Sequence, residues 1–260
     1  MIRLIASDID GTLLQNGEKE ISVRMFELIE KLEKHNIFFI PASGRPIASL
    51  RPLFGPRAGQ MTFICENGAL LIERGRRIGL TEIPRKDALT IAQQIADYSG
   101  LQPLVSGAGA RYVLDRNLDW LHYAGYFIGR EVASVKTFEE IQEPMIKVTA
   151  WCPVGVNNEI RSFFENKWAD RYSVAIAGDH WLDVTLADKG KGLHQIAEHY
   201  GVRREEIMVF GDNFNDLPMF REAAVSYAMR HSVPEVQAIA DQVCDRVEEC
   251  LEEFLLNEIN

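Results

Sequence analysis

Apolar runs and amphipathic stretches alternate at both ends of the chain. The apolar run at 2–6 precedes residues at helical spacing over 21–32, and a short apolar run follows at 37–40. Apolar positions three and four apart predict a helix with one buried face, and short apolar runs predict buried strands. Further strands are expected at 61–65, 207–210, 225–229 and 242–244, with a helix over 190–200. This alternation indicates a parallel sheet covered by helices.

The middle of the chain has a different pattern. Strand-like runs at 69–72 and 77–80 flank a turn at Gly75, as in an antiparallel hairpin. More strands are expected at 111–114, 145–150 and 181–185, and helices at 85–99 and 157–168. We therefore predict an α/β fold: a Rossmann-like, doubly wound parallel-sheet core formed by 1–80 and 187–260, with an α+β domain inserted at 81–186. Pro41 suggests that the second core strand ends early or twists.

Composition narrows the function classes. The 260 residues carry a net charge of −10, which disfavours nucleic-acid binding because the phosphate backbone would be repelled. No apolar stretch approaches the roughly 20 residues that span a bilayer, and acidic residues appear too early for a signal peptide, so we expect a cytoplasmic protein without membrane association. Four scattered cysteines indicate neither a zinc site nor a disulfide framework. The oligomeric state stays open.

Two acids end the first predicted strand. Side chains at i and i+2 share one face of a strand, so Asp8 and Asp10 would repel each other until a cation or a proton intervened. Gly11 then permits a sharp turn. The position predicts a chemical use for the two carboxylates.

Three other polar signals fall at the same edge of the predicted sheet. Ser43 and Gly44 follow the second strand, Asp212 follows a later strand, and Lys189 opens the helix ahead of that strand. Ligands of doubly wound sheets bind outside the carboxyl ends of the strands, where crossover helices also begin. Pro46 suits the first position of a helix, so Ser43 and nearby N–H groups would form a binding site for an anion.

The oxygen-rich run at 211–219 suits Mg²⁺, a hard cation that takes one or two carboxylates from a protein and keeps several waters. Ca²⁺ is disfavoured because the run lacks the regular ligand alternation and the bidentate Glu of an EF-hand loop. A purely structural alternative is a helix start at which Asn215 or Asp216 acts as a cap.

Two of these segments resemble motifs of a known family. Asp8-Ile9-Asp10-Gly11-Thr12-Leu13 resembles the first motif of the haloacid dehalogenase (HAD) phosphohydrolase superfamily. The run 211–219 is similar to the G-D-x-x-N-D-x-x-M segment of its Cof-type (subfamily IIB) phosphatases. All four family motifs occur in order, with an insertion the size of a cap domain between the second and third. The resemblance covers essentially the whole chain.

The resemblance implies a Mg²⁺-dependent phosphatase that acts on small phosphorylated metabolites, such as sugar phosphates, with the inserted domain as a specificity cap. It implies that Asp8 is the nucleophile that forms an aspartyl-phosphate, that Asp10 is the acid/base, and that Lys189 lies beside the nucleophile. The metal residues would be Asp8, Asp10 through its carbonyl, Asp212 and Asp216. The phosphate or substrate contacts would be Ser43, Gly44, Arg45, Lys189 and Asn215.

Alternatives remain for one residue and for the activity. The family places a lysine 23 residues before the metal-binding Asp, which matches Lys189 (212 − 189 = 23), although Lys191 is a neighbouring candidate. A phosphomutase would use the same intermediate and return the phosphoryl group to a sugar. A regulator that binds metal and phosphate without turnover is a third possibility.

Overall fold

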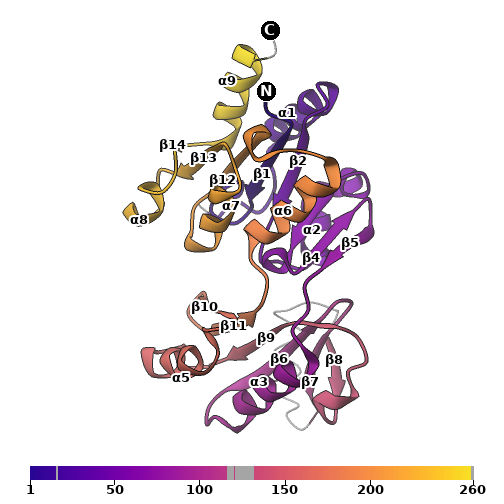
Figure 1. The fold of residues 1–260 in the computed structure, drawn as a ribbon, viewed down its shortest axis with the longest axis vertical. Coiled ribbons are helices and arrows are strands. Elements are labelled where there is room, and N and C mark those ends of the chain that lie inside the picture. The colour runs from indigo at the N-terminus through magenta and orange to yellow at the C-terminus, as the bar shows by residue number, and fades with distance from the viewer. Residues whose placement is uncertain (16, 116–119, 121–131, 259–260) are drawn as a thin grey trace. The chain divides into compact units, whose positions relative to one another are not determined.

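The chain forms two compact units. The structure is a computed structural model that describes residues 1–15, 17–115, 120 and 132–258. One unit, the core, comprises Met1–Gly79 and Asp188–Asn260, and the other, the inserted unit, comprises Leu80–Ala187 (Figure 1). Each crossing between them lies one residue from the position expected from the sequence.

The core is built on an eight-stranded sheet. Its strand order is β14-β13-β12-β1-β2-β3-β4-β5. The pairs from β14 to β3 are parallel, and β3 pairs with β4 in the antiparallel direction. The strands are β1 Leu4–Asp8, β2 Phe38–Ala42, β3 Thr62–Cys65, β4 Leu70–Glu73, β5 Arg76–Leu80, β12 Ile207–Gly211, β13 Val225–Met229 and β14 Gln242–Cys244.

The order of the strands reverses at β1. The chain proceeds from β1 through β2 to β3 on one side and later returns to β12, β13 and β14 on the other. All five residues of β1 are buried, as expected for a central strand with both faces covered. Leu4 pairs in register with Phe38 of β2 and Ile207 of β12. The carboxyl ends of β1 and β12 therefore meet at the topological switch point, where open α/β sheets bind ligands.

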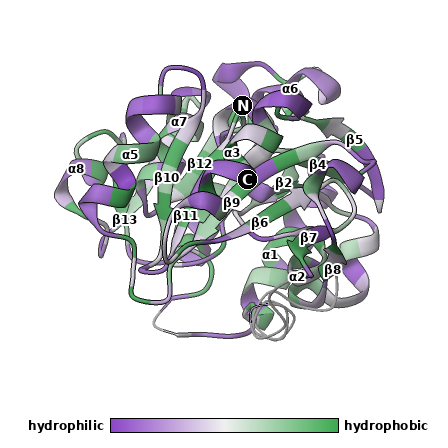
Figure 2. Cartoon of the chain, turned by 90° about the horizontal axis from the view of Figure 1, so that it is seen from below, coloured by the Kyte–Doolittle hydropathy of each residue, from purple (hydrophilic) through white to green (hydrophobic). Residues whose placement is uncertain are grey.

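Amphipathic helices cover the sheet. They are α1 Val23–Lys34, α2 Ile47–Phe54, α6 Lys189–Tyr200, α7 Leu217–Arg221, α8 Pro234–Gln237 and α9 Val247–Glu258, with 3₁₀ turns η1 Gly55–Gly59, η2 Glu66–Gly68, η4 Arg204–Glu206 and η5 Phe214–Asp216. The Ser22 hydroxyl caps α1 by accepting the Met25 N–H at 3.0 Å. The buried face of α1 is formed by predicted apolar positions, and Figure 2 shows hydrophilic residues on the exposed parts of the helices.

Two proline predictions need correction. Strand β2 does not end early: it continues through Pro41, which pairs in register with Ser7, to Ala42. Proline has no N–H to donate to a neighbouring strand. Pro41 is tolerated in β2 because β2 pairs with β3 only at Ala42 and Ile64, after the proline. Pro46 is the residue before α2 and not its first helical residue.

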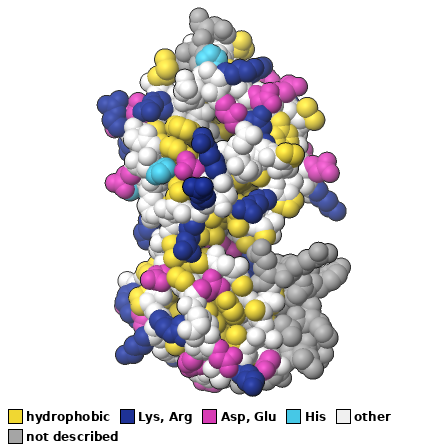
Figure 3. All heavy atoms as spheres, turned by 90° about the vertical axis from the view of Figure 1, so that its right-hand side faces the viewer, with side chains coloured by type: hydrophobic (Ala, Val, Ile, Leu, Met, Phe, Trp, Pro, Cys, Tyr) yellow, Lys and Arg dark blue, Asp and Glu magenta, His cyan; other side chains and the backbone are white. Residues whose placement is uncertain are grey.

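One edge of the core sheet, at β5, is basic. Strand β5 ends the strand order, and the exposed arginines on its hairpin and on the neighbouring α2 are Arg51, Arg74, Arg76 and Arg77. In Figure 3 the side of the molecule that carries β5 faces the viewer, and Lys and Arg side chains (dark blue) lie along its middle. Charged side chains on an edge strand oppose pairing with a strand of another molecule.

The inserted unit contains a six-stranded sheet, and helices α3 and α5 pack on one of its faces. Its strand order is β10-β11-β9-β6-β7-β8, and only the β7–β8 pair is parallel among those recorded. Helices α3 and α5 pack on Val105, Val148 and Val184. The elements are α3 Arg85–Asp97, β6 Gln102–Gly107, β7 Arg111–Leu114, β8 Val132–Val135, η3 Phe138–Glu140, β9 Met145–Trp151, α5 Asn158–Trp168, β10 Ser173–Ala177 and β11 Trp181–Thr185. Within the described residues, no helix is both long enough and apolar enough to span a bilayer.

The first turn of α6 offers a test of the packing that holds Lys189. We expect Gly190→Ala to destabilise the protein by about 1–3 kcal/mol, because a Cβ there would lie 2.5 Å from the Pro218 carbonyl oxygen. Helix propensity alone predicts the opposite, a gain of up to about 1 kcal/mol. Urea unfolding measures the difference. Gly59→Ala, at a position with no atom within 4 Å of the added Cβ, is the control, and equal stability of the two variants would contradict the expectation.

Candidate active site

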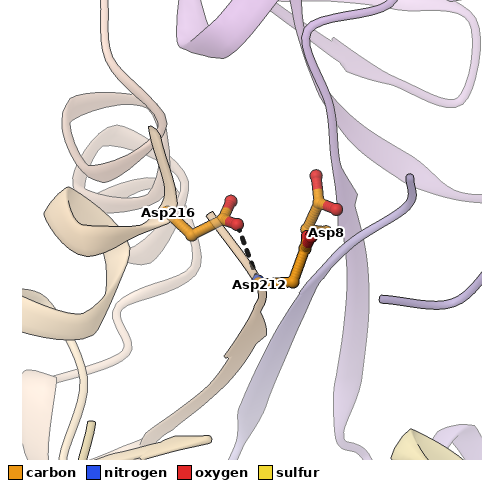
Figure 4. Close-up of side chains that lie close together, drawn as sticks. All are labelled: Asp8, Asp212 and Asp216. Atoms are coloured by element: carbon orange, nitrogen blue, oxygen red, sulfur yellow. Dashed lines mark hydrogen bonds between the residues drawn. The ribbon is translucent and has the colours of Figure 1, made fainter. Parts of the chain in front are cut away.

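Three carboxylates meet where β1 and β12 end. Asp8 is the last residue of β1, Asp212 follows β12, and Asp216 closes η5. One oxygen from each lies within 4.8 Å of the others (Figure 4). Asp8 is separated from the other two by about 200 positions of sequence, and the switch point brings them together.

A buried ammonium group joins two of the three acids. The Lys189 Nζ donates to Asp8 Oδ1 and, at 2.6 Å, to Asp216 Oδ1. Lys189 is the first residue of α6, whose N-cap Asp188 accepts the Lys191 N–H at 2.8 Å. The exposed Lys191 side chain lies 3.2 Å from Asp188. The structure therefore places Lys189 beside Asp8, and Lys191 on the helix surface.

Asp216 has both oxygens engaged within the protein. Its Oδ2 accepts the backbone N–H of Asp212 at 3.0 Å (Figure 4). The same oxygen accepts the Asn213 N–H at 3.0 Å, while Oδ1 binds Lys189. It is fully buried. Asp216 thus holds the 212–216 turn and the lysine in place, which leaves Asp8 and Asp212 as the acids with more freedom to bind a cation directly.

Burial and the neighbouring charges shift the pKa values of the cluster. Burial raises the pKa of Asp8 well above its ordinary value; Lys189 opposes that shift, and the charge of Asp216 adds to it. Burial also raises the pKa of Asp212, again with help from Asp216. For Lys189, burial alone would lower the pKa, but the charges of Asp216 and Asp8 raise it above its ordinary value, so the lysine is cationic.

The cluster fits a divalent cation. Asp8 Oδ2 is buried and has no hydrogen-bond partner among the described residues, which is costly for a carboxylate oxygen. Carboxylate oxygens are the ligands that Mg²⁺ prefers. Asp212 is held by the Thr12 hydroxyl, which donates to its Oδ1 at 3.1 Å. The Gly11 backbone packs so closely on Asp212 that a Cβ there would lie 2.3 Å from Oδ2. Gly11 is also left-handed, with a φ of 94°.

Asp10 lies outside the carboxylate cluster. Its exposed carboxylate accepts two hydrogen bonds from Arg45, one of them from Nε at 2.8 Å. Sequence reasoning proposed the two residues for separate roles and did not anticipate their contact.

The predicted anion-binding site lies at the end of β2. Ser43 is buried, and its hydroxyl accepts the Arg45 N–H at 3.1 Å. Asn215 is exposed, and its Nδ2 donates to Asn67 Oδ1 at 3.2 Å. Gly44 packs on the same Asn67 amide: a Cβ on Gly44 would lie 3.2 Å from both Nδ2 and Oδ1 of Asn67.

Two residues near the site were missed from the sequence. Asn67 follows β3 at the carboxyl edge of the sheet, and its Asn-Gly pair was a detectable turn signal. His231 Nε2 lies 3.9 Å from Asp212 Oδ2, although its spacing from other histidines indicates no metal site. It lies in the loop after β13, so only the topology brings it near.

The family assignment follows from comparison with known proteins. The family model for haloacid dehalogenase-like hydrolases matches residues 5–250. The chain belongs to the haloacid dehalogenase-like hydrolase family. The predicted family and α/β fold are confirmed, and so is the class of enzyme, a phosphoric monoester hydrolase.

Relatives of this HAD-family chain align over nearly its full length. A 5-amino-6-(5-phospho-D-ribitylamino)uracil phosphatase of Escherichia coli is 23% identical, over 92% of this chain and 89% of the relative. A phosphoglycolate phosphatase of Staphylothermus marinus is 27% identical, over 94% and 91%. The solved structure of a HAD subclass IIB sugar phosphatase shares the fold with a TM-score of 0.80 and 24% identity, covering 97% of this chain and 98% of the other.

The raised pKa of Asp8 predicts a pH-dependent effect of Asp8→Asn in EDTA. A raised folded-state pKa contributes stability below the unfolded value, near pH 4, and that contribution is lost as the pH rises through the raised pKa. Asp8→Asn removes the buried charge, so its melting temperature should exceed that of the wild type by a few degrees at pH 8 and not at pH 4.

Circular dichroism melts across this pH range measure the difference. Asp170→Asn, at an exposed position, is the control. A gap between Asp8→Asn and wild type that stays constant with pH would contradict the electrostatic origin.

Proposed function

We propose that this protein hydrolyses small phosphomonoesters with Asp8 as the nucleophile and Mg²⁺ as the cofactor. The observation that supports this most strongly is the state of Asp8: a buried carboxylate at the sheet's switch point, with one oxygen bound to Lys189 and the other without a partner. A nucleophile needs a fixed orientation and an oxygen to which no protein group is bound, and among the described residues Asp8 has both.

The proposed reaction has two steps. Asp8 attacks phosphorus and forms an aspartyl-phosphate, the bond from phosphorus to the ester oxygen breaks, and Asp10 gives a proton to the leaving oxygen. Asp10 then takes a proton from water as the water attacks phosphorus, which releases inorganic phosphate and restores Asp8. Asp10 lies outside the buried cluster, so the two carboxylates occupy different environments, as different roles require.

Charge explains the need for cations. A phosphate dianion near this site meets Asp8, Asp212 and Asp216, and each like-charge contact costs on the order of 4 kcal/mol at 4 Å for an effective dielectric near 20. Mg²⁺ would be held by Asp8, Asp212 and the Asp10 carbonyl, with Asp216 fixing their surroundings. The ion would neutralise this repulsion and stabilise the charge that develops in phosphoryl transfer.

The remaining residues would clamp the phosphate. Ser43, the Gly44 backbone and Asn215 would donate hydrogen bonds to its oxygens, and Lys189 would add positive charge beside the nucleophile. Arg45 would contact the substrate once it releases Asp10, because a carboxyl group that carries the transferred proton cannot accept hydrogen bonds from the guanidinium at both oxygens.

Sugar phosphates and similar metabolites are the proposed substrate class. The two relatives described above are named for the phosphate esters of a ribityl compound and of glycolate, both small phosphomonoesters. We propose that the inserted unit, expected at 81–186, is the cap that selects among such substrates.

Release of inorganic phosphate from a panel of metabolite phosphates tests the function. We expect Mg²⁺-dependent release by wild type, loss of activity in EDTA with recovery on added Mg²⁺, and a fall of at least about 1,000-fold in Asp8→Asn, since the nucleophile is removed. Activity that persists in EDTA or in Asp8→Asn would refute the mechanism. Isomerisation of a sugar phosphate that requires a bisphosphate activator would indicate a phosphomutase.

The two neighbouring lysines make a matched pair. Lys189→Met should lower kcat by about 100-fold or more, because it removes the buried cation that contacts Asp8. Lys191→Met should stay within about twofold of wild type, because that side chain is exposed on the helix surface and its ion pair with Asp188 lies outside the carboxylate cluster. Steady-state kinetics on the best substrate, with circular dichroism to verify folding, compare them. A larger loss in Lys191→Met would reverse the assignment.

A further inference from the structure

Three consecutive residues after β3 have left-handed backbone. The φ angles of Glu66, Asn67 and Gly68 are 49°, 54° and 93°. Glycine adopts this conformation readily, but Glu and Asn do so at a cost, and such backbone persists where the surroundings enforce it. The turn therefore calls for an explanation beyond chain reversal.

The turn is hydrogen-bonded to one loop of the candidate active site and packs against a second segment of it. The Glu66 N–H donates to the Arg45 carbonyl at 3.1 Å, and the Asn67 N–H donates to the Ser43 carbonyl at 3.0 Å. Gly68 packs directly on the residue before Lys189, since a Cβ on Gly68 would lie 2.2 Å from the Asp188 carbonyl oxygen. These contacts fix where the Asn67 side chain projects.

The Asn67 amide touches two residues that we propose to bind phosphate. It packs on Gly44, and its Oδ1 accepts a hydrogen bond from Asn215 Nδ2 at 3.2 Å. A side-chain amide nitrogen has two hydrogens, so this bond uses one and sets the direction of the other. Asn215 is exposed, and Asn67 is the partner recorded for its amide.

We propose that Asn67 is a positioning residue of the phosphate-binding site formed by Ser43, Gly44 and Asn215. Its Oδ1 orients the Asn215 amide so that the second N–H of Asn215 faces the phosphate. This inference rests on the proposed function. The left-handed turn serves the same end, because it delivers the amide of Asn67 to the gap between Gly44 and Asn215. Asn67 acts through Asn215 and does not itself touch the reacting atoms.

Asn67→Gly separates this role from a structural one. Glycine suits a φ of 54°, so the turn should persist and the melting temperature should equal or exceed that of wild type. Without the acceptor, we expect KM for the phosphomonoester and Kd for inorganic phosphate to rise about fivefold, the effect of one hydrogen bond, with kcat within about twofold. The Kd is measured by calorimetry in the presence of Mg²⁺.

Asn36→Gly is the matched control. Asn36 is also left-handed, with a φ of 59°, but it lies between α1 and β2, away from the site. It should show a similar change in melting temperature with unchanged KM and Kd. A rise in KM in both variants would mean that backbone flexibility alone is responsible, and would overturn the proposal.

A double-mutant cycle tests whether Asn67 acts through Asn215. In the Asn215→Ala background, Asn67→Gly should change KM and Kd by less than about twofold, because its bonding partner is absent. A full fivefold effect in that background, or wild-type values in the single variant, would refute the inference. If wild type binds phosphate with Mg²⁺ but hydrolyses no substrate, the proposed function fails, and the Kd values still decide the role of Asn67.

Discussion

The ammonium group of Lys189, buried between Asp8 and Asp216, is the interaction on which the site depends. Three clustered carboxylates and one ammonium leave two negative charges if all four groups are ionised. Removing charges from water costs several kcal/mol per ion, and a buried ion pair seldom repays that cost in stability. The cluster is therefore better explained by the chemistry it permits than by its contribution to folding. Burial, with the charge of Asp216, raises the pKa of Asp8 despite the opposing effect of Lys189.

The topology determines which side chains can meet. Because β1 and β12 are neighbours although far apart in sequence, the residues that end them lie at one edge, and α6 begins over the same edge with Lys189. Backbone contacts then fix the details. The bare Gly11 backbone admits Asp212, and Asp216 ties the Asp212 and Asn213 amides together. The positions of the charges are set by main-chain geometry, which limits their freedom to rearrange when a substrate arrives.

Much of this could be predicted from the sequence, and the exceptions have a common cause. Short apolar runs and helical spacing located the core strands and α1 because periodicity reflects burial directly. The grouping of Asp8, Asp212 and Lys189 followed from the strand-end rule. The pairing of Asp10 with Arg45 depends on side-chain direction, which no spacing encodes. Asn67 was missed because an Asn-Gly pair is ordinarily a turn signal, and its role emerges only from contacts with residues more than 20 and more than 140 positions away.

The unfavourable features of the site are related to one another. An unpaired buried oxygen on Asp8, left-handed backbone at Glu66 and Asn67, and excess negative charge all cost stability in the free protein. A divalent cation would bind the unpaired Asp8 oxygen and offset the excess negative charge. A phosphate held by the Asn215 amide would use the arrangement that the left-handed backbone maintains. Since these costs are already incurred before a ligand binds, its binding requires little reorganisation. That is the condition under which fixed charges and dipoles stabilise a transition state most effectively.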